Sequence, residues 1–98
     1  MISIKLFKQG EDLVIGACDE HLLGQKFVDG KFQINVTRNF YDGERIQNSS
    51  LKRFLEEATI ANLVGEETVK LAIKYGFVDP ECVLKINGIP HAQIVRMI

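Results

Sequence analysis

The stretch from Glu57 to Gly76 is the longest apolar-rich segment of this 98-residue chain, and it restricts the fold more than any other. It contains no proline, and Gly65 divides it into two parts. Its apolar residues continue the spacing of a helix that begins near Leu51. The pattern therefore predicts one helix through Val64, a sharp corner at Gly65, and a second helix that ends at Gly76.

The first of these helices is expected to lose its polar face beyond Glu57, because Ile60 and Val64 fall on the side that Arg53 occupies earlier. A helix that is apolar all round is covered on both sides, by its own fold or by another chain. This predicts that Ile60 and Val64 pack against the second helix or form a homodimer interface. Asn62 falls within the apolar stripe, where its amide must be hydrogen-bonded, so it is a candidate binding residue.

Alternation of apolar and polar residues predicts strands elsewhere in the chain. These segments are Ile2–Leu6, Leu13–Cys18 and Lys31–Thr37. Together with a C-terminal hairpin they indicate an α+β fold, in which an antiparallel sheet (N-terminal hairpin, third strand, C-terminal hairpin) packs against the two consecutive helices. The chain length allows one domain with one core, residues 1–98.

The C-terminal hairpin is predicted from Asn87-Gly88, which lies between two apolar runs. Both turn residues need a positive φ, and this dipeptide supplies them. With this loop, Lys85 opposes Pro90 and Cys82 opposes Gln93. Because proline lacks an N–H, the last strand is expected to be an edge strand near Pro90.

Composition restricts the classes of partner. A net charge of −1 and a pI near 6.1 give no electrostatic reason to expect duplex nucleic acid or an anionic membrane, although a small local patch for RNA stays open. No apolar run reaches transmembrane length, and the strand-like N-terminus is unlike a signal peptide. We therefore expect a cytoplasmic protein without a membrane partner, whose two cysteines are reduced.

Cys18, His21, Cys82 and His91 are the residues that might support catalysis or bind a metal. Cys18 and His21 have the spacing of metal ligands, but the second pair does not, which disfavours a zinc site. Cys18 could also be a nucleophile, because it precedes the predicted short helical turn after Asp19, and such a helix start lowers a thiol pKa. The opposing interpretation is a small buried cysteine and an exposed histidine.

Four other residues are candidates for binding: His91, Gln93, Phe40 and Tyr41. His91 and Gln93 share one face of the predicted last strand, where a histidine is more often a hydrogen-bonded core or interface residue than a catalyst. Phe40 and Tyr41 are adjacent, so one ring can pack in the core while the other is displayed to a partner.

Four segments together resemble a known family. They are Gly16–Glu20, Glu57–Glu66, Val78–Pro80 and Asn87–Met97. The chain resembles, over essentially its whole length, the small archaeal proteins of domain-of-unknown-function family 424. The resemblance implies an archaeal cytoplasmic protein and carries over no activity and no catalytic residue. Because genes of the family often lie among translation genes, it also implies a role near RNA or the translation apparatus.

These observations favour a non-enzymatic binding or adaptor protein that needs no cofactor. Its expected partner is a protein or a ribonucleoprotein, such as a ribosome or a translation factor. The alternative is a thiol- or metal-dependent enzyme that uses Cys18 with His21 or His91. The two hypotheses differ in one structural requirement, since only the second needs these side chains to converge.

Overall fold

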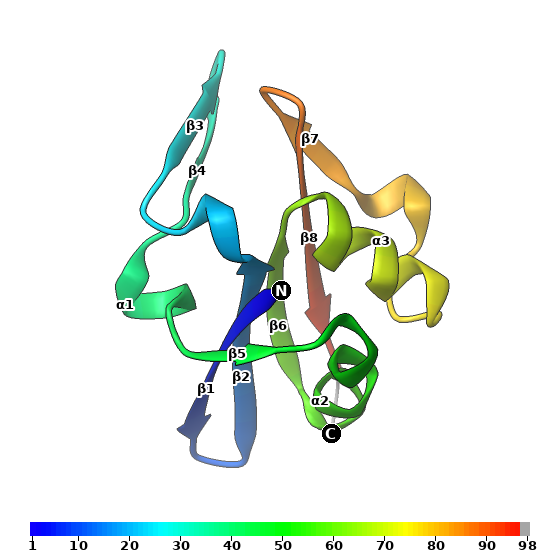
Figure 1. Ribbon diagram of the computed structural model, residues 1–98. Coiled ribbons are helices and arrows are strands. Elements are labelled where there is room, and N and C mark those ends of the chain that lie inside the picture. The colour runs from blue at the N-terminus through cyan, green and yellow to red at the C-terminus, as the bar shows by residue number, and fades with distance from the viewer. Residues whose placement is uncertain (97–98) are drawn as a thin grey trace.

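The computed structural model describes residues 1–96 and confirms the predicted α+β class (Figure 1). Six strands form the main sheet in the order β5-β1-β2-β6-β8-β7. Their bounds are β1 Ile2–Gln9, β2 Asp12–Asp19, β5 Glu44–Ile46, β6 Ile60–Val64, β7 Leu84–Ile86 and β8 Ile89–Val95. The sheet is mixed rather than purely antiparallel, because β2 and β6 run parallel. The parallel pair is possible because a long crossover that contains a helix separates these two strands in sequence.

The helices are short. They are α1 (Arg38–Tyr41), α2 (Leu51–Glu57) and α3 (Glu66–Lys74), with 3₁₀ turns η1 (Glu20–Leu22), η2 (Asn48–Ser50) and η3 (Pro80–Cys82). In the part of the chain that the structure describes, no helix has the length and apolarity to cross a membrane. The α3 helix agrees with the sequence pattern: it ends at Lys74, and Gly76 follows with a φ of 82°, which stops it.

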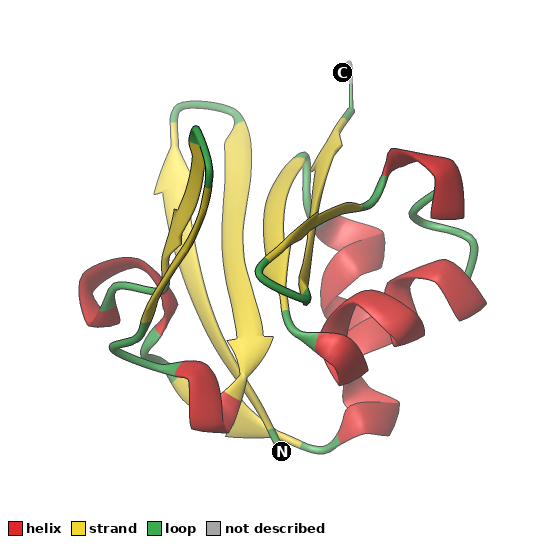
Figure 2. Ribbon diagram, turned by 90° about the horizontal axis from the view of Figure 1, so that it is seen from above, coloured by secondary structure: helices red, strands yellow, loops and turns green. Residues whose placement is uncertain are grey.

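The main sheet separates two layers (Figure 2). Helices α2 and α3 cover one face, where alternate strand residues build the larger core. This core contains Ile2, Ile4, Ile15, Ala17, Ala61, Leu63, Ala92 and Ile94 from the sheet, with Leu51, Leu55, Val69 and Ala72 from the helices. The opposite face holds a second, smaller cluster and is only partly covered.

The prediction of a helix through Val64 is wrong. Helix α2 ends at Glu57, Ala58 has extended backbone angles, and residues 60–64 form the inner strand β6. A five-residue apolar run has the same composition in a buried strand as in a buried helix, so periodicity alone cannot separate them. The segment has apolar residues on both sides because Ala61 and Leu63 pack in the larger core, whereas Val64 packs in the smaller cluster on the other face.

This correction removes the reason for a homodimer interface at Ile60 and Val64. Val64 is 0% exposed, and its strand neighbours are Cys18 on β2 and His91 on β8. It belongs to the smaller cluster, on the side of the sheet away from α3. The Val64 side chain, which was expected to contact α3 or another chain, is therefore enclosed by the sheet and by residues of η1 and the β3–β4 hairpin.

The third predicted strand, Lys31–Thr37, lies outside the main sheet. The part that forms a strand, β4 (Phe32–Asn35), pairs with β3 (Lys26–Asp29) as a separate hairpin over the partly covered face. Its Ile34 is buried, but Phe32 is 57% exposed although it shares the same strand face. The hairpin extends beyond the sheet at its tip, where the Asn87 N–H donates to the Asp29 carboxylate (3.2 Å).

The C-terminal hairpin has the predicted register at its tip, with Lys85 opposite Pro90. Cys82 does not oppose Gln93, because it lies in η3 before the strand begins. The last strand as a whole is not an edge strand, since β8 lies between β6 and β7, but at Pro90 itself it pairs with β7 alone, because the pairing with β6 begins at His91. Proline is tolerated there because β6 ends at this point: the Gly65 N–H donates to the Pro90 carbonyl (2.9 Å), while the Gly65 carbonyl accepts from Val69 of α3 (3.0 Å).

Asp19 directly precedes η1, the short helical turn predicted after it, but its side chain caps helix α3 instead. Its side chain makes no capping bond to η1 but reaches the N-terminus of α3, where it accepts from the Glu67 N–H (3.1 Å), the Thr68 N–H (2.9 Å) and Thr68 Oγ1 (2.8 Å). Gly65 allows this approach, because a Cβ there would overlap the Asp19 carboxylate and its φ is +114°. The corner that the sequence placed at Gly65 is therefore the junction of β6, β8 and α3.

Candidate functional site

The partly covered face of the sheet is the candidate functional site. The hairpin β3–β4 and η1 cover one end of this face over Cys18 and Val64. The other end is covered only at its margin, by α1. We define the open face as the side chains of Phe7, Ile60, Asn62, Gln93 and Val95, with Phe40 and His91 at its borders. The strand register places these five on the same side of β1, β6 and β8.

Two amides lie at the centre of the open face. Asn62 and Gln93 are directly opposite each other on β6 and β8, and Gln93 Nε2 donates to Asn62 Oδ1 (2.9 Å). The Asn62 amide was predicted to need a hydrogen-bond partner because its sequence neighbours are apolar, and Gln93 is that partner. The pair still has an Asn62 amide nitrogen and a Gln93 carbonyl oxygen for other partners, and Gln93 is exposed.

Aromatic rings border the amides on the β1 side. The Phe40 ring stacks on Phe7 with centroids 5.2 Å apart and planes 11° apart, and Lys5 Nζ lies 5.3 Å from the centroid of Phe7. Phe40 lies directly over Gly16, where any Cβ would overlap the ring and the Phe40 carbonyl. Both phenylalanines are half-buried, so each keeps part of its ring accessible to a partner.

Tyr41 is not part of the accessible surface. Its side chain is buried in the smaller cluster, and burial raises the pKa of its phenol to about 12. Of the two adjacent aromatics, Tyr41 therefore packs inside while Phe40 borders the open face.

His91 lies at the opposite border of the open face. It is half-buried, and burial lowers the pKa of its imidazole below the ordinary value, which favours the neutral form at neutral pH. Together with Cys82, Leu84 and Gln93 it lines a depression of about 270 Å³ at the edge of the sheet. A neutral imidazole offers one hydrogen-bond donor and one acceptor, which suits recognition of polar groups.

The geometry argues against Cys18 as a nucleophile or metal ligand. Its side chain is fully buried, and the pKa of its thiol rises to about 12, chiefly through burial and also through Asp19, despite an opposing effect of Arg45. His91 is two strands away, roughly 10 Å at the usual strand spacing, and His21 lies exposed on η1. Within residues 1–96 no three His, Cys, Asp or Glu side chains converge as metal ligands would.

The two cysteines should therefore react with thiol reagents at very different rates. A pKa near 12 instead of 9 lowers the thiolate fraction of Cys18 roughly a thousandfold at pH 8, and burial also blocks access to the reagent. We expect a colorimetric thiol assay to show one fast thiol per folded chain and a second only after denaturation. Cys82→Ser should remove the fast thiol. Two equally fast thiols in the folded chain would contradict the burial of Cys18.

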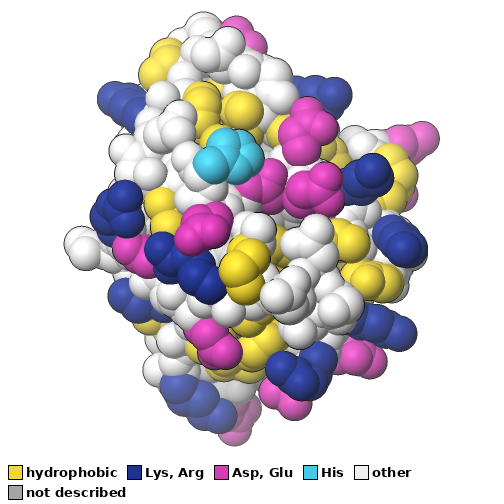
Figure 3. Space-filling model, viewed as in Figure 1, with side chains coloured by type: hydrophobic (Ala, Val, Ile, Leu, Met, Phe, Trp, Pro, Cys, Tyr) yellow, Lys and Arg dark blue, Asp and Glu magenta, His cyan; other side chains and the backbone are white. Residues whose placement is uncertain are grey.

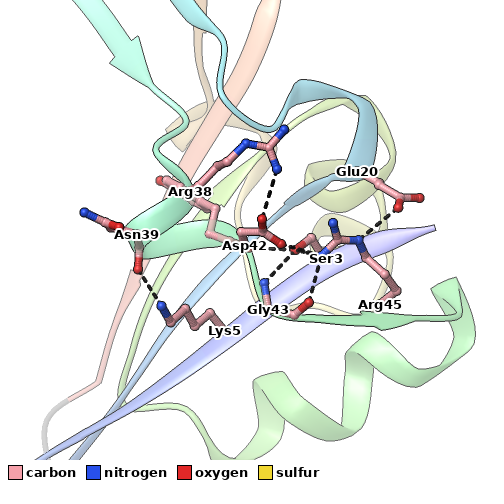
Figure 4. Close-up of polar contacts among 9 residues, drawn as sticks. Ser3, Lys5, Glu20, Arg38, Asn39, Asp42, Gly43 and Arg45 are labelled. Carbon is pink, nitrogen blue, oxygen red and sulfur yellow. Dashed lines mark hydrogen bonds and ion pairs between the residues drawn. The ribbon is translucent and has the colours of Figure 1, made fainter.

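Sequence reasoning missed the most connected polar cluster of the described chain (Figure 4). Arg45 Nη1 donates to Asp42 Oδ1 (2.7 Å), to the Gly43 carbonyl (2.7 Å) and to Ser3 Oγ (3.2 Å), while its Nε donates to Glu20 (2.9 Å). The partners are up to 42 residues apart in sequence, so no local spacing revealed them. The Asp42-Gly43 turn was the one visible signal.

This cluster has a structural role. Hydrogen bonds from Arg45 and Arg38 lower the pKa of the Asp42 carboxyl, and the bonds to Asp42 and Glu20 raise the pKa of Arg45. The charges are mutually neutralised, and Ser3 Oγ donates to the Tyr41 carbonyl (2.7 Å). The cluster thus fastens the end of α1 to β1 and β5, which holds Phe40 over the sheet.

Fold and surface together define a small α+β domain with a partly covered sheet face and, among residues 1–96, no cluster of three side chains that could hold a metal ion. The chain belongs to the family described as "Protein of unknown function (DUF424)", whose model matches residues 7–97. No curated protein matches the sequence. The chain is also similar to the crystal structure of an uncharacterized conserved protein from Methanopyrus kandleri, with a TM-score of 0.80, 22% identity, and coverage of 99% of this chain and 94% of that chain. That likeness shows the fold.

Proposed function

We propose that this protein is a non-enzymatic binding protein of the cytoplasm, and that its open face binds single-stranded RNA within a ribonucleoprotein partner. The observation that supports the proposal is the proximity, on one accessible sheet face, of stacked phenylalanine rings, an amide pair and a neutral imidazole. Unpaired bases stack on aromatic side chains and are recognised by hydrogen bonds to their edges.

The charge distribution fits this mode of binding better than binding to a duplex. Duplex binding depends on a continuous basic surface. Basic and acidic side chains are interspersed on the side of the molecule that Figure 3 shows, which is not the side of the open face, and the net charge of the whole chain is −1. Beside the open face, Lys5 Nζ lies 5.3 Å from the centroid of Phe7 and donates to the Asn39 carbonyl (2.8 Å). The ammonium has further N–H donors, which can contact a phosphate next to a stacked base.

A matched pair of variants tests the proposal. Val95 is 70% exposed on the open face, and Val28 is 52% exposed on the hairpin β3–β4, away from it. Val95→Glu introduces a charge that repels phosphates, whereas Val28→Glu makes the same change elsewhere. We expect RNA to co-purify with the tagged wild type and with Val28→Glu in gentle salt, and to fall at least tenfold with Val95→Glu.

Nuclease treatment separates the classes of partner. Loss of all associated material after nuclease supports RNA as the direct ligand. A protein that stays bound after nuclease, yet is lost with Val95→Glu, would replace RNA by a protein as the ligand of the open face. Equal recovery with both variants would show that the open face is not the binding surface.

A further inference from the structure

A second surface lies on the helix-covered side of the sheet, away from the open face. It is a groove of about 310 Å³ between α3, η3 and the C-terminal hairpin. Its apolar lining consists of Val69, Ile73, Pro80, Val83 and Pro90, and its charged residues are Glu66, Lys70 and Lys85. This volume is at the lower end of the range for pockets that hold small ligands, and it suits one bulky side chain.

The groove forms because the sheet extends beyond the helix that covers it. Helix α3 packs over β2, β6 and β8, while the edge strand β7 extends the sheet beyond it. The chain returns from α3 to β7 through η3, which begins at Pro80 and places Val83 just before the strand. The groove between helix and edge strand is therefore walled by apolar residues but not filled by them.

Two lysines flank the groove from opposite walls. Lys70 comes from α3, and Lys85 comes from β7, where its pairing with Pro90 directs it to the helix side. Both are exposed, and within residues 1–96 neither lies within ion-pair distance of a carboxylate. Glu66 is the one acidic lining residue, so the lining has a net positive charge.

We propose that this groove binds an acidic segment of a protein partner. One bulky apolar side chain of the segment enters between Val69 and Val83, and carboxylates beside it contact Lys70 and Lys85. An apolar anchor combined with flanking charges of opposite sign is a common way to recognise a peptide in a groove. Because the groove and the open face lie on opposite sides of the sheet, both can be occupied at once, as an adaptor requires.

The test uses short synthetic peptides and amide chemical shifts of the full-length protein. The probe is acetyl-Glu-Leu-Phe-Glu-amide, with Lys-Leu-Phe-Lys and Glu-Ser-Ser-Glu versions as controls. Since a tetrapeptide is expected to bind at about millimolar concentration, the titration extends to about 5 mM. We expect saturable shifts at Val69, Ile73 and Val83 with the first peptide, and at least tenfold weaker effects with either control.

Charge reversal of the two lysines completes the test. Lys70→Glu combined with Lys85→Glu should weaken binding of the acidic peptide at least tenfold. The matched control, Lys8→Glu with Lys31→Glu, changes two other exposed lysines and should leave binding unchanged. The proposal is overturned if the acidic peptide causes no shifts at 5 mM, if the lysine peptide binds equally well, or if the Lys70/Lys85 variant binds like wild type.

Discussion

Val64→Glu is expected to destabilise the protein strongly. Val64 is fully buried in an inner strand of the sheet, next to Cys18 and among the apolar side chains of the smaller cluster. A carboxylate there has no partner, and an uncompensated buried charge costs about 3–5 kcal/mol. A domain of this size has only about 5–15 kcal/mol of stability in total. Urea unfolding followed by circular dichroism should show a free energy of unfolding that is lower by about 3–5 kcal/mol.

Val95→Glu provides the control, because it makes the same substitution on the same sheet at a position that is 70% exposed. Surface changes of this kind usually alter stability by less than about 0.5 kcal/mol. Light scattering on both variants then tests the homodimer hypothesis. A folded Val64→Glu variant whose mass is half that of the wild type would restore the interface and contradict the structure.

The error at residues 60–64 shows what an apolar pattern leaves undetermined. An amphipathic element has a polar side whose spacing distinguishes a helix from a strand, as in α3. In residues 60–64 the only polar residue is Asn62, and its partner Gln93 lies on another strand. With no polar face, the remaining signal is length, and a run of five residues between Thr59 and Gly65 favours a strand.

The C-terminal turn and its register were predicted correctly. Asn87 and Gly88 have φ values of 51° and 79°, as the two-residue turn requires, and the register of Ile86 with Ile89 follows from the turn itself. The prediction that the third strand belongs to the main sheet was wrong, because it relied on alternation alone and not on a turn. Its alternation is consistent with any sheet, and the Asp29-Gly30 turn that joins it to β3 was the signal that it belongs to a separate hairpin.

The candidate site could be predicted only as a set of residues. Asn62 and Phe40 were identified singly, whereas His91 and Gln93 were placed on one face of the last strand, and the structure brings all four to one side of the sheet. Phe7 was missed, because an aromatic on an N-terminal strand gives no sign that a ring 33 residues later stacks on it. Such contacts form between segments that are far apart in the sequence, so the spacing of residues along the chain does not predict them.

Asp19→Ala is the second substitution with a large expected effect. The carboxylate is buried and accepts three hydrogen bonds from the start of α3, two of them from backbone N–H groups. Removing it leaves the two buried Thr68 donors without a partner, whereas the Glu67 N–H is only part-buried. Loss of a cap combined with buried unsatisfied donors should lower the free energy of unfolding by roughly 3 kcal/mol. Urea unfolding monitored by circular dichroism measures this loss.

Two milder changes show whether capping of α3 is the cause. Asp19→Asn keeps one oxygen, which can still accept from the Thr68 N–H and Thr68 Oγ1, and loses mainly the bond from Glu67. Thr68→Val removes one side-chain donor, which is typically worth about 1 kcal/mol. We therefore expect the loss of stability to increase from Thr68→Val through Asp19→Asn to Asp19→Ala. Amide exchange should also accelerate first in α3, because this helix starts at the capped end. If instead Asp19→Ala were as stable as Thr68→Val, the junction of β6, β8 and α3 would be held by packing around Gly65 rather than by the carboxylate.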